Sequence, residues 1–131
     1  MMVGASTCMT VRLITGAAQG RELVLECRYE ADDPWAVALD FGPQEGAVWT
    51  LSRELLAAGL REPAGHGDVH LEPDDRGGVL IALSGTAGVA LLTAPRVRLA
   101  GFLAATEAVV PIGAESAHVD WDRCISELLS T

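Results

Sequence analysis

The chain has no lysine, so its nine basic residues are all arginine, and eighteen acidic residues outnumber them. The formal net charge is therefore −9. A chain this acidic repels polyanions unless its arginines gather on one face. The composition argues against nucleic acid and against anionic membrane surfaces as partners.

Cysteine is also scarce. Cys8, Cys27 and Cys124 are odd in number and far apart, and each has apolar neighbours. This pattern predicts neither a disulfide framework nor a zinc site. We expect reduced, partly buried thiols instead.

Long apolar runs are absent as well. No stretch approaches the ~20 apolar residues that a membrane-spanning helix needs, and Met1–Thr15 lacks the basic start and apolar centre of a signal peptide. Half of the 131 residues are nevertheless apolar, which is enough for one buried core. We expect a single cytoplasmic domain over residues 1–131, without an integral membrane segment.

Catalytic signatures do not stand out. The chain has no Gly-x-Ser-x-Gly elbow, and the segment Gly85–Gly88 has the wrong spacing and no lysine for a phosphate loop. The sequence predicts a protein that is not an enzyme and needs no cofactor. As an alternative, His66, Asp68 and His70 would project from one face of a strand and could bind the metal of a small enzyme. A polar, solvent-facing strand is the simpler interpretation, because no fourth ligand is evident.

Alternating apolar residues between turn signals predict strands. Asp32, Asp33 and Pro34 form the clearest break, because proline restricts its own backbone and that of the residue before it. The expected strands are Thr7–Ile14, Arg21–Tyr29, Trp35–Phe41, Ala47–Leu51, His66–Glu72, Val79–Leu83 and Val89–Thr93.

Three helices are expected. Ser52 is the predicted N-cap of a short helix with a left-handed stop at Gly59. Pro95 suits the first turn of a longer helix that ends near Val109. A terminal helix is expected over His118–Leu129, with Cys124, Ile125, Leu128 and Leu129 on one side.

Strands followed by a helix, and then again strands followed by a helix, indicate an α+β fold with mostly antiparallel strands and a C-terminal helix. The large aromatic residues fit this plan as members of the core rather than as stacking platforms. These residues are Trp35, Phe41, Trp49 and Phe102.

Several short elements resemble the SsgA-like proteins, the sporulation and cell-division family of morphologically complex actinobacteria. They occur in the family's order over residues ~28–115 of this chain, and such an ordered set is hard to obtain by chance. The matching elements are Arg28-Tyr29 with Asp33-Pro34 and Ala36-Val37, Trp49 with Ser52–Leu56 and Gly59-Leu60, Gly65–Val69 with Pro73, Ala82–Ser84 with Ala90–Leu92 and Ala94-Pro95, and Phe102-Leu103 with Thr106, Val110-Pro111, Gly113 and Glu115.

The resemblance implies a non-enzymatic regulator that acts at division septa through protein contacts. The implied partners are the tubulin-like division protein FtsZ, another SsgA-like protein, or both. It also implies a homotrimer with a fold similar to the whirly fold of single-stranded nucleic-acid binders, built from two antiparallel sheets. A nucleic-acid-binding module is therefore an alternative, which the acidic charge disfavours.

Five residues are candidate partner contacts. Arg53 and Arg61 bracket the short helix, where they are either solvated charges or contacts. Trp121, between Asp120 and Asp122, is either a half-buried helix anchor or an exposed contact.

Overall fold

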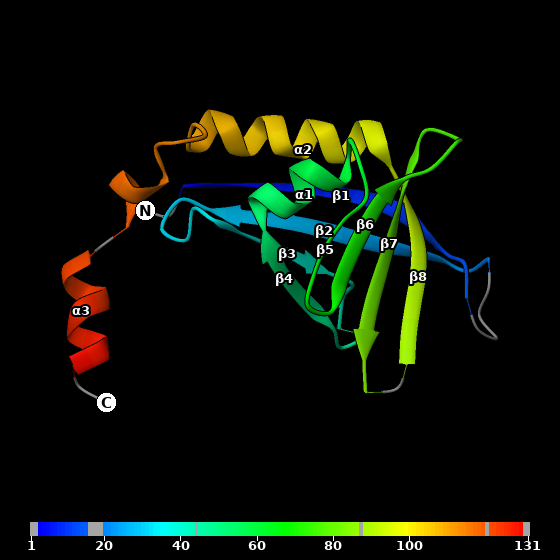
Figure 1. Cartoon of the computed structure of the whole chain (residues 1–131), viewed down its shortest axis with the longest axis horizontal. Helices are drawn as coiled ribbons and strands as arrows, with labels where there is room; N and C mark the ends of the chain where they lie inside the picture. Colours follow the sequence, from blue (N-terminus) through cyan, green and yellow to red (C-terminus); the bar gives the residue numbers. More distant parts are fainter. Residues whose placement is uncertain (1–2, 16–19, 44, 87, 120, 130–131) are drawn as a thin grey trace.

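The computed structural model describes residues 3–15, 20–43, 45–86, 88–119 and 121–129. In these residues four strands and a helix are followed by four more strands and a helix, and two short helices end the chain (Figure 1). The second half has one strand more than predicted, because Ala64–His66 and Val69–Pro73 form a hairpin of two strands where a single strand was expected. The elements are β1 (Gly4–Leu13), β2 (Glu22–Glu30), β3 (Ala36–Asp40), β4 (Val48–Ser52), α1 (Arg53–Gly59), β5 (Ala64–His66), β6 (Val69–Pro73), β7 (Gly78–Gly85), β8 (Gly88–Pro95), α2 (Arg96–Val109), the 3₁₀ helix η1 (Glu115–His118) and α3 (Trp121–Leu129).

The strands form one antiparallel sheet in the order β4-β3-β2-β1-β8-β7-β6-β5. The expectation of two sheets is wrong, because β1 pairs with β2 along one edge and with β8 along the other edge, there through Arg12↔Thr93 and Leu13↔Leu92. This ladder is short, whereas β1 pairs with β2 along most of its length. Two four-stranded halves thus become a single curled sheet through one narrow junction.

The core lies between the inner face of this sheet and the helices α1 and α2. α2 runs along β1 and also packs on β7 and β8, while α1 packs on β4, β5, β6 and α2 (Figure 1). Alternation along the strands supplies the inner face. The fully buried side chains include Leu25, Leu39, Leu71, Ile81, Leu99 and Phe102.

The N-cap of α1 is confirmed, but its predicted stop is wrong. The Ser52 hydroxyl accepts a hydrogen bond of 2.9 Å from the Leu55 N–H. Gly59 is the last helical residue and does not adopt a positive φ, and Leu60 is the C-cap with right-handed geometry. A Cβ at Gly59 would lie 2.5 Å from the Leu71 Cβ. Glycine is needed here for close packing of the helix on β6, not for a left-handed turn.

The ends of the other helices differ slightly from expectation. Pro95 is the N-cap of α2, with an extended backbone, and the helix ends at Val109 as predicted. The predicted terminal helix is divided, because His118 belongs to η1 and α3 begins at Trp121. α3 extends away from the sheet at the C-terminal end of the chain (Figure 1).

Candidate interaction site

Arg53, at the first position of α1, is buried rather than solvated, and the expectation of an exposed charge is wrong. Its side chain is 2% exposed. Nη1 donates hydrogen bonds to the carbonyl oxygens of Val110 at 2.7 Å and Thr106 at 3.3 Å, and Nη2 donates to Glu115 Oε2 at 2.8 Å. A guanidinium is well suited to such a place, because several donors point in fixed directions from one planar group. Arg53 therefore cannot contact a partner from its position in this fold.

The aromatic ring of Tyr29 lies against this guanidinium. Cζ of Arg53 lies 5.0 Å from the centroid of the Tyr29 ring, which is a cation–π arrangement. The Tyr29 hydroxyl donates a 2.8 Å hydrogen bond to the Pro34 carbonyl oxygen in the turn between β2 and β3. Burial raises the pKa of the Tyr29 hydroxyl, although the nearby Arg53 opposes this effect. The tyrosine thus joins the turn to the buried cation.

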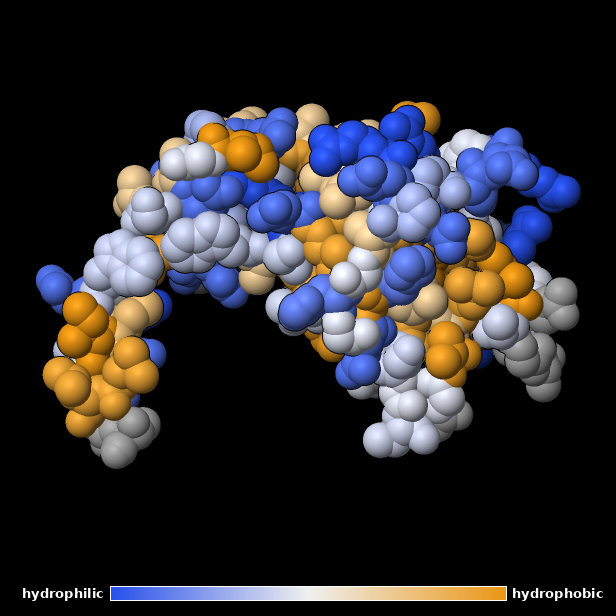
Figure 2. Space-filling view, viewed as in Figure 1, coloured by the Kyte–Doolittle hydropathy of each residue, from blue (hydrophilic) through white to orange (hydrophobic). Residues whose placement is uncertain are grey.

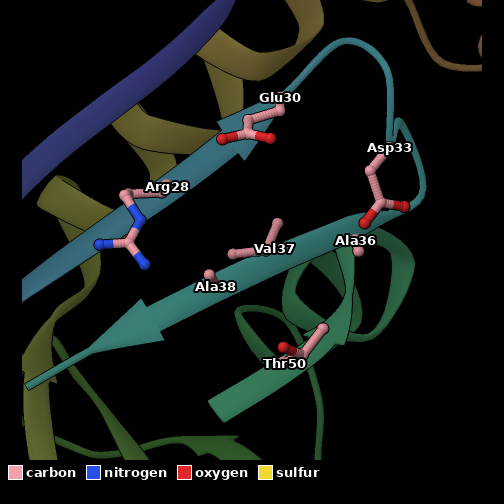
Figure 3. Close-up of a pocket in the computed structure, with 7 residues that line it drawn as sticks. All are labelled: Arg28, Glu30, Asp33, Ala36, Val37, Ala38 and Thr50. Atoms are coloured by element: carbon pink, nitrogen blue, oxygen red, sulfur yellow. The ribbon is translucent and has the colours of Figure 1, made fainter. Parts of the chain in front are cut away.

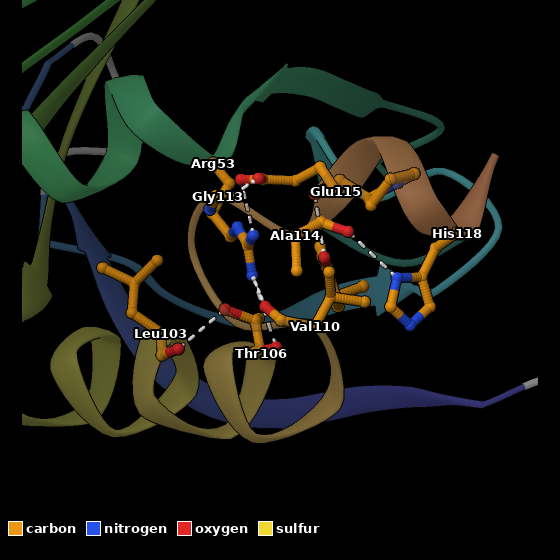
Figure 4. Close-up of polar contacts among 10 residues, drawn as sticks. Arg53, Leu103, Thr106, Val110, Gly113, Ala114, Glu115 and His118 are labelled. Carbon is orange, nitrogen blue, oxygen red and sulfur yellow. Dashed lines mark hydrogen bonds and ion pairs between the residues drawn. The ribbon is translucent and has the colours of Figure 1, made fainter.

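Glu115 accepts a hydrogen bond from the same guanidinium (Figure 4). Its Oε1 accepts the Gly113 N–H at 2.7 Å, while Oε2 accepts Arg53. These hydrogen bonds, that from Arg53 foremost, hold the pKa of the Glu115 carboxyl below its usual value. Gly113 has a φ of +93°, which favours glycine, so the tight bend after α2 brings Glu115 back towards α1.

Elements that are far apart in the sequence meet at this cluster of Tyr29, Pro34, Arg53 and Glu115. All four belong to the elements through which the sequence resembles the SsgA-like proteins. A single sequence offers no signal that these residues touch, because 62 positions separate Arg53 from Glu115. Some of the residues that resemble the family therefore form an internal cluster, which positions the chain beyond α2, and do not form a binding surface.

Two tryptophans form a second joint at the base of α3. The rings of Trp35 and Trp121 have centroids 6.3 Å apart and are tilted by 58°. Trp121 Nε1 also donates to the Ser116 carbonyl oxygen at 3.0 Å. Their exposed fractions are 46% and 52%, so the prediction that Trp35 belongs to the core is wrong. It lies in the turn before β3, whereas Phe41 and Phe102 are buried as expected.

α3 presents its apolar residues to solvent. Ile125, Leu128 and Leu129 are 53%, 76% and 82% exposed, and Cys124 is half-buried. Figure 2 shows these orange side chains on a projecting arm that a hollow separates from the body of the molecule. Exposed apolar groups gathered on one helix mark an interaction surface more often than a structural element.

The remaining candidate contacts have different positions. Arg61 is exposed just after α1, and Asp122 is exposed in the first turn of α3. Asp120 lies outside the described residues. The structure brings Trp121 and Asp122 together on the arm but places Arg61 beside the β5–β6 side of the sheet, which α1 covers.

A shallow polar pocket of about 150 Å³ lies over β2 and β3 (Figure 3). Arg28 points across it and binds Asp40 at 2.5 Å and Glu26 at 3.0 Å. The Gly42 N–H and Arg28 lower the pKa of the Asp40 carboxyl, and Asp40 and Glu26 raise the pKa of Arg28. The cation is thus paired within the chain. The pocket is lined by Arg28, Glu30, Asp33, Ala36, Val37, Ala38 and Thr50.

The strand that was expected to align His66, Asp68 and His70 is interrupted. β5 ends at His66, the chain turns through Gly67 and Asp68, and β6 begins at Val69, so His66 pairs with Val69 across a hairpin. The expected alternation of three ligands on one strand face is therefore wrong. Across the described part of the chain, no three histidine, cysteine or acidic side chains are grouped closely enough to hold a metal ion.

The buried thiol is chemically quiet. Cys27 lies in the core, and burial raises its pKa to about 12, so the thiol remains protonated near neutral pH. Cys8, which was expected to be partly buried, is exposed on β1.

No helix in the described ranges is both long enough and apolar enough to cross a bilayer.

Comparison with known sequences agrees with these observations. The family model described as "Streptomyces sporulation and cell division protein, SsgA" matches residues 23–115. The sporulation-specific cell division protein SsgB of Streptomyces coelicolor is 40% identical over 125 residues, which cover 92% of this chain and 91% of that protein. SsgB of Frankia casuarinae is 36% identical over 126 residues, with coverages of 92% and 88%.

The fold is also similar to that of a solved relative. The crystal structure of an SsgA-like sporulation-specific cell division protein from Thermobifida fusca superposes with a TM-score of 0.82. The two sequences are 35% identical, and the alignment covers 95% of each chain. The curled sheet and its helices are therefore shared with this relative.

Proposed function

The chain belongs to the SsgA family of sporulation and cell division proteins, and from this we propose that it regulates sporulation-specific septation through protein–protein contacts rather than catalysis. The observation that carries the proposal is similarity over nine-tenths of the chain to proteins named as sporulation-specific cell division proteins. The exposed apolar arm, α3, supports a role in binding.

In this proposal the protein is cytoplasmic and gathers at division septa. Its partners there are FtsZ, another SsgA-like protein, or both, and it recruits or positions the septal machinery. The same proposal includes self-association as a homotrimer. It also includes similarity of the subunit fold to the whirly fold. Several identical surfaces on one assembly would strengthen modest contacts to a polymer by raising the effective concentration.

Localisation tests the role in septation. A fluorescent fusion expressed from its own promoter in sporulating cells is expected to form a ladder of bands that coincide with sporulation septa. Deletion of the gene is expected to reduce or misplace those septa. Diffuse fluorescence throughout septation, together with normal septa in the deletion strain, would contradict the proposal.

Direct recruitment requires a separate test. Purified protein is expected to co-sediment with FtsZ polymers assembled with GTP, and to remain in the supernatant when GTP is omitted. A variant with Ile125→Glu and Leu129→Glu tests the arm without touching the core, because both side chains are exposed. Val97→Glu, at an 80% exposed position on α2, is the matched control. If the same amount of protein sediments with and without FtsZ polymers, the protein does not bind the polymer directly, and recruitment would need an intermediate protein.

A further inference from the structure

The two edges of the curled sheet, β4 and β5, differ in how they are protected. Unpaired backbone groups at an edge attract another strand unless the edge is short, charged, covered or interrupted by proline. β5 has only three residues, follows directly after Pro63 and is packed by α1. β4 has the sequence Val-Trp-Thr-Leu-Ser, without a charge or a proline, and no strand of the described residues lies beyond it (Figure 1). β4 is thus the unprotected edge.

The backbone of β4 is free at alternate residues. In an antiparallel ladder every second residue points its N–H and C=O groups at the neighbouring strand. The Arg53 N–H donates to the Trp35 carbonyl oxygen at 2.7 Å, so the odd-numbered residues of β4 are those that bond to β3. Val48 and Thr50 therefore point their N–H and C=O groups away from β3. Val48 is 54% exposed and Thr50 is also exposed, so a further strand can reach these groups.

A strand added beside β4 would extend the polar pocket on the outer face of the sheet (Figure 3). Thr50 of β4 lines this pocket, and Ala36 and Ala38 of β3 lie beyond it. The small alanine side chains leave room above the sheet. Because successive side chains of a strand point to opposite faces, every second side chain of the added strand would lie on this side. A long side chain there can extend over the alanines.

The acidic residues of this pocket, Glu30 and Asp33, are open to a cation. Among the described residues, no arginine or histidine forms an ion pair with either of them. Arg28 lines the same pocket, but it is paired with Asp40 and Glu26. Two uncompensated carboxylates attract positive charge. The outer face therefore fits an added strand whose side chains on this side are basic.

The other face of an added strand would meet apolar side chains. Trp49 of β4 is half-buried and lines an apolar pocket of about 260 Å³ together with Leu23, Phe41 and Ala47. A side chain opposite Trp49 on the added strand would point to this same face and is stabilised there if it is apolar. The two faces of β4 thus favour different chemistry in alternate residues of the added strand.

We propose that β4 binds an extended segment of a partner protein by strand addition, and that basic and apolar residues alternate in this segment. Hydrogen bonds to the backbone of Val48 and Thr50 supply affinity, and the alternate side chains supply specificity. The inference rests on the proposed action through protein contacts and deepens it by naming the edge and the chemistry of the bound segment. A second copy of β4 is a poor occupant, because its outer face would bring further unpaired acids instead of cations.

Synthetic peptides test this proposal on the full-length protein. The probe is a short fluorescein-labelled peptide in which valine and arginine alternate. One control peptide alternates valine with glutamate, and another has the composition of the probe but groups all its valines at one end. Fluorescence anisotropy at low salt is expected to show that the probe binds at least tenfold more tightly than either control peptide.

Proline at the edge tests the backbone contact. Thr50→Pro removes a free N–H but no hydrogen bond to β3, and edge strands tolerate proline at such positions. Thr50→Val keeps the N–H and is the matched control. Thr50→Pro is expected to bind the probe at least tenfold more weakly than wild type, and Thr50→Val is expected to bind it like wild type. Circular dichroism and thermal melts establish folding, and Val48→Pro replaces Thr50→Pro if that variant is not folded.

Neutralising the acids tests the charge contact. Glu30→Gln with Asp33→Asn is expected to weaken binding of the probe and to reduce its dependence on salt. Glu62→Gln with Glu107→Gln removes the same net charge at exposed positions that do not line the pocket, and is expected to bind almost like wild type. Equal losses in the two double variants would show that only the overall charge of the protein attracts the probe, and would overturn the inference.

Amide hydrogen exchange followed by NMR distinguishes strand addition from attraction between opposite charges. The bound probe is expected to slow exchange at the N–H groups of Val48 and Thr50, which have no partner strand in the free protein. Unchanged exchange at both groups, or equal binding of the three peptides, would contradict the proposal. So would weaker self-association of Thr50→Pro than of Thr50→Val in sedimentation without peptide, because the edge would then pair with a second copy.

These outcomes are independent of the role in septation. The peptides bind, or fail to bind, the purified protein without any division partner, so a negative result leaves septal localisation as a separate question. Conversely, protection of Val48 and Thr50 by the probe would stand even if the fluorescent fusion were diffuse. The two proposals can therefore fail separately.

Discussion

Arg53 and Glu115 form an ion pair of 2.8 Å in which the guanidinium is 2% exposed and the carboxylate 14% exposed. The pair joins the start of α1 to the segment after α2. Because a buried charge is tolerated only with partners, Arg53 depends on Glu115 and on the two carbonyl groups of α2 and its C-cap. The arrangement links the core to the base of the projecting arm.

Replacement of Arg53 by alanine is expected to destabilise the protein by about 3 kcal/mol, because it leaves buried acceptors without a donor. Arg53→Lys should recover only part of this loss, since one ammonium cannot replace the planar fork. Urea unfolding measures the effect. Arg61→Ala, at an exposed position beside the same helix, is the control and should change stability by less than about 0.5 kcal/mol. Equal effects of the two alanine variants would contradict the structural role of Arg53.

Stability should fall in acid partly through Glu115. Its pKa is lowered in the folded protein, so its contribution is present above the unfolded pKa of about 4.3 and is lost as pH falls through the folded value. Asp40 and Asp74 also have lowered pKa values and add to the trend. Glu115→Gln should be less stable than wild type at neutral pH, with the difference shrinking below about pH 4. Urea unfolding at a series of pH values measures both proteins. A difference in unfolding free energy between wild type and Glu115→Gln that stays constant from neutral pH to below about pH 4 would exclude this role of Glu115.

Two helical glycines should respond in opposite ways to alanine. At Gly59 the new Cβ would lie 2.5 Å from Leu71 Cβ, and overpacking of this kind costs about 1–3 kcal/mol. At Gly101, in α2, no atom lies within 4 Å of the new Cβ, so Gly101→Ala should stabilise the helix by about 0.5–1 kcal/mol. Thermal melts of the two variants measure how the same substitution, glycine to alanine, changes stability at each position. A stabilising Gly59→Ala would refute the close approach of α1 to β6.

The contact between Trp35 and Trp121 should hold the base of α3. Either tryptophan replaced by alanine is expected to speed amide hydrogen exchange in residues 121–129, because the helix then opens more readily. In the double variant the two effects should not add, with a coupling of about 0.5–1.5 kcal/mol in the opening free energy. Exchange in β2 should be unchanged and serves as the internal control. Strictly additive effects would show that the rings do not support each other.

Local signals in the sequence predicted most of the elements correctly. The alternation of Leu23, Leu25 and Cys27 placed β2, and Ser52 before a helical segment placed the start of α1, because strand period and N-capping depend on neighbouring residues. The same logic failed at Gly59. In a sequence, a glycine near the end of a helix is equally consistent with a left-handed stop and with a close packing contact. Only the position of Leu71 in the folded protein shows that Gly59 serves the packing contact.

The sequence by itself thus determined the α+β class, most of the order of strands and helices, and the family. Tertiary structure decided that β1 and β8 join two halves into one sheet, that Arg53 is buried against Glu115, and that Trp35 meets Trp121 at the base of α3. Each of these contacts joins residues that are far apart along the chain. Hydrophobic periodicity and capping act over a few residues, so they carry no information about which distant segments pack together.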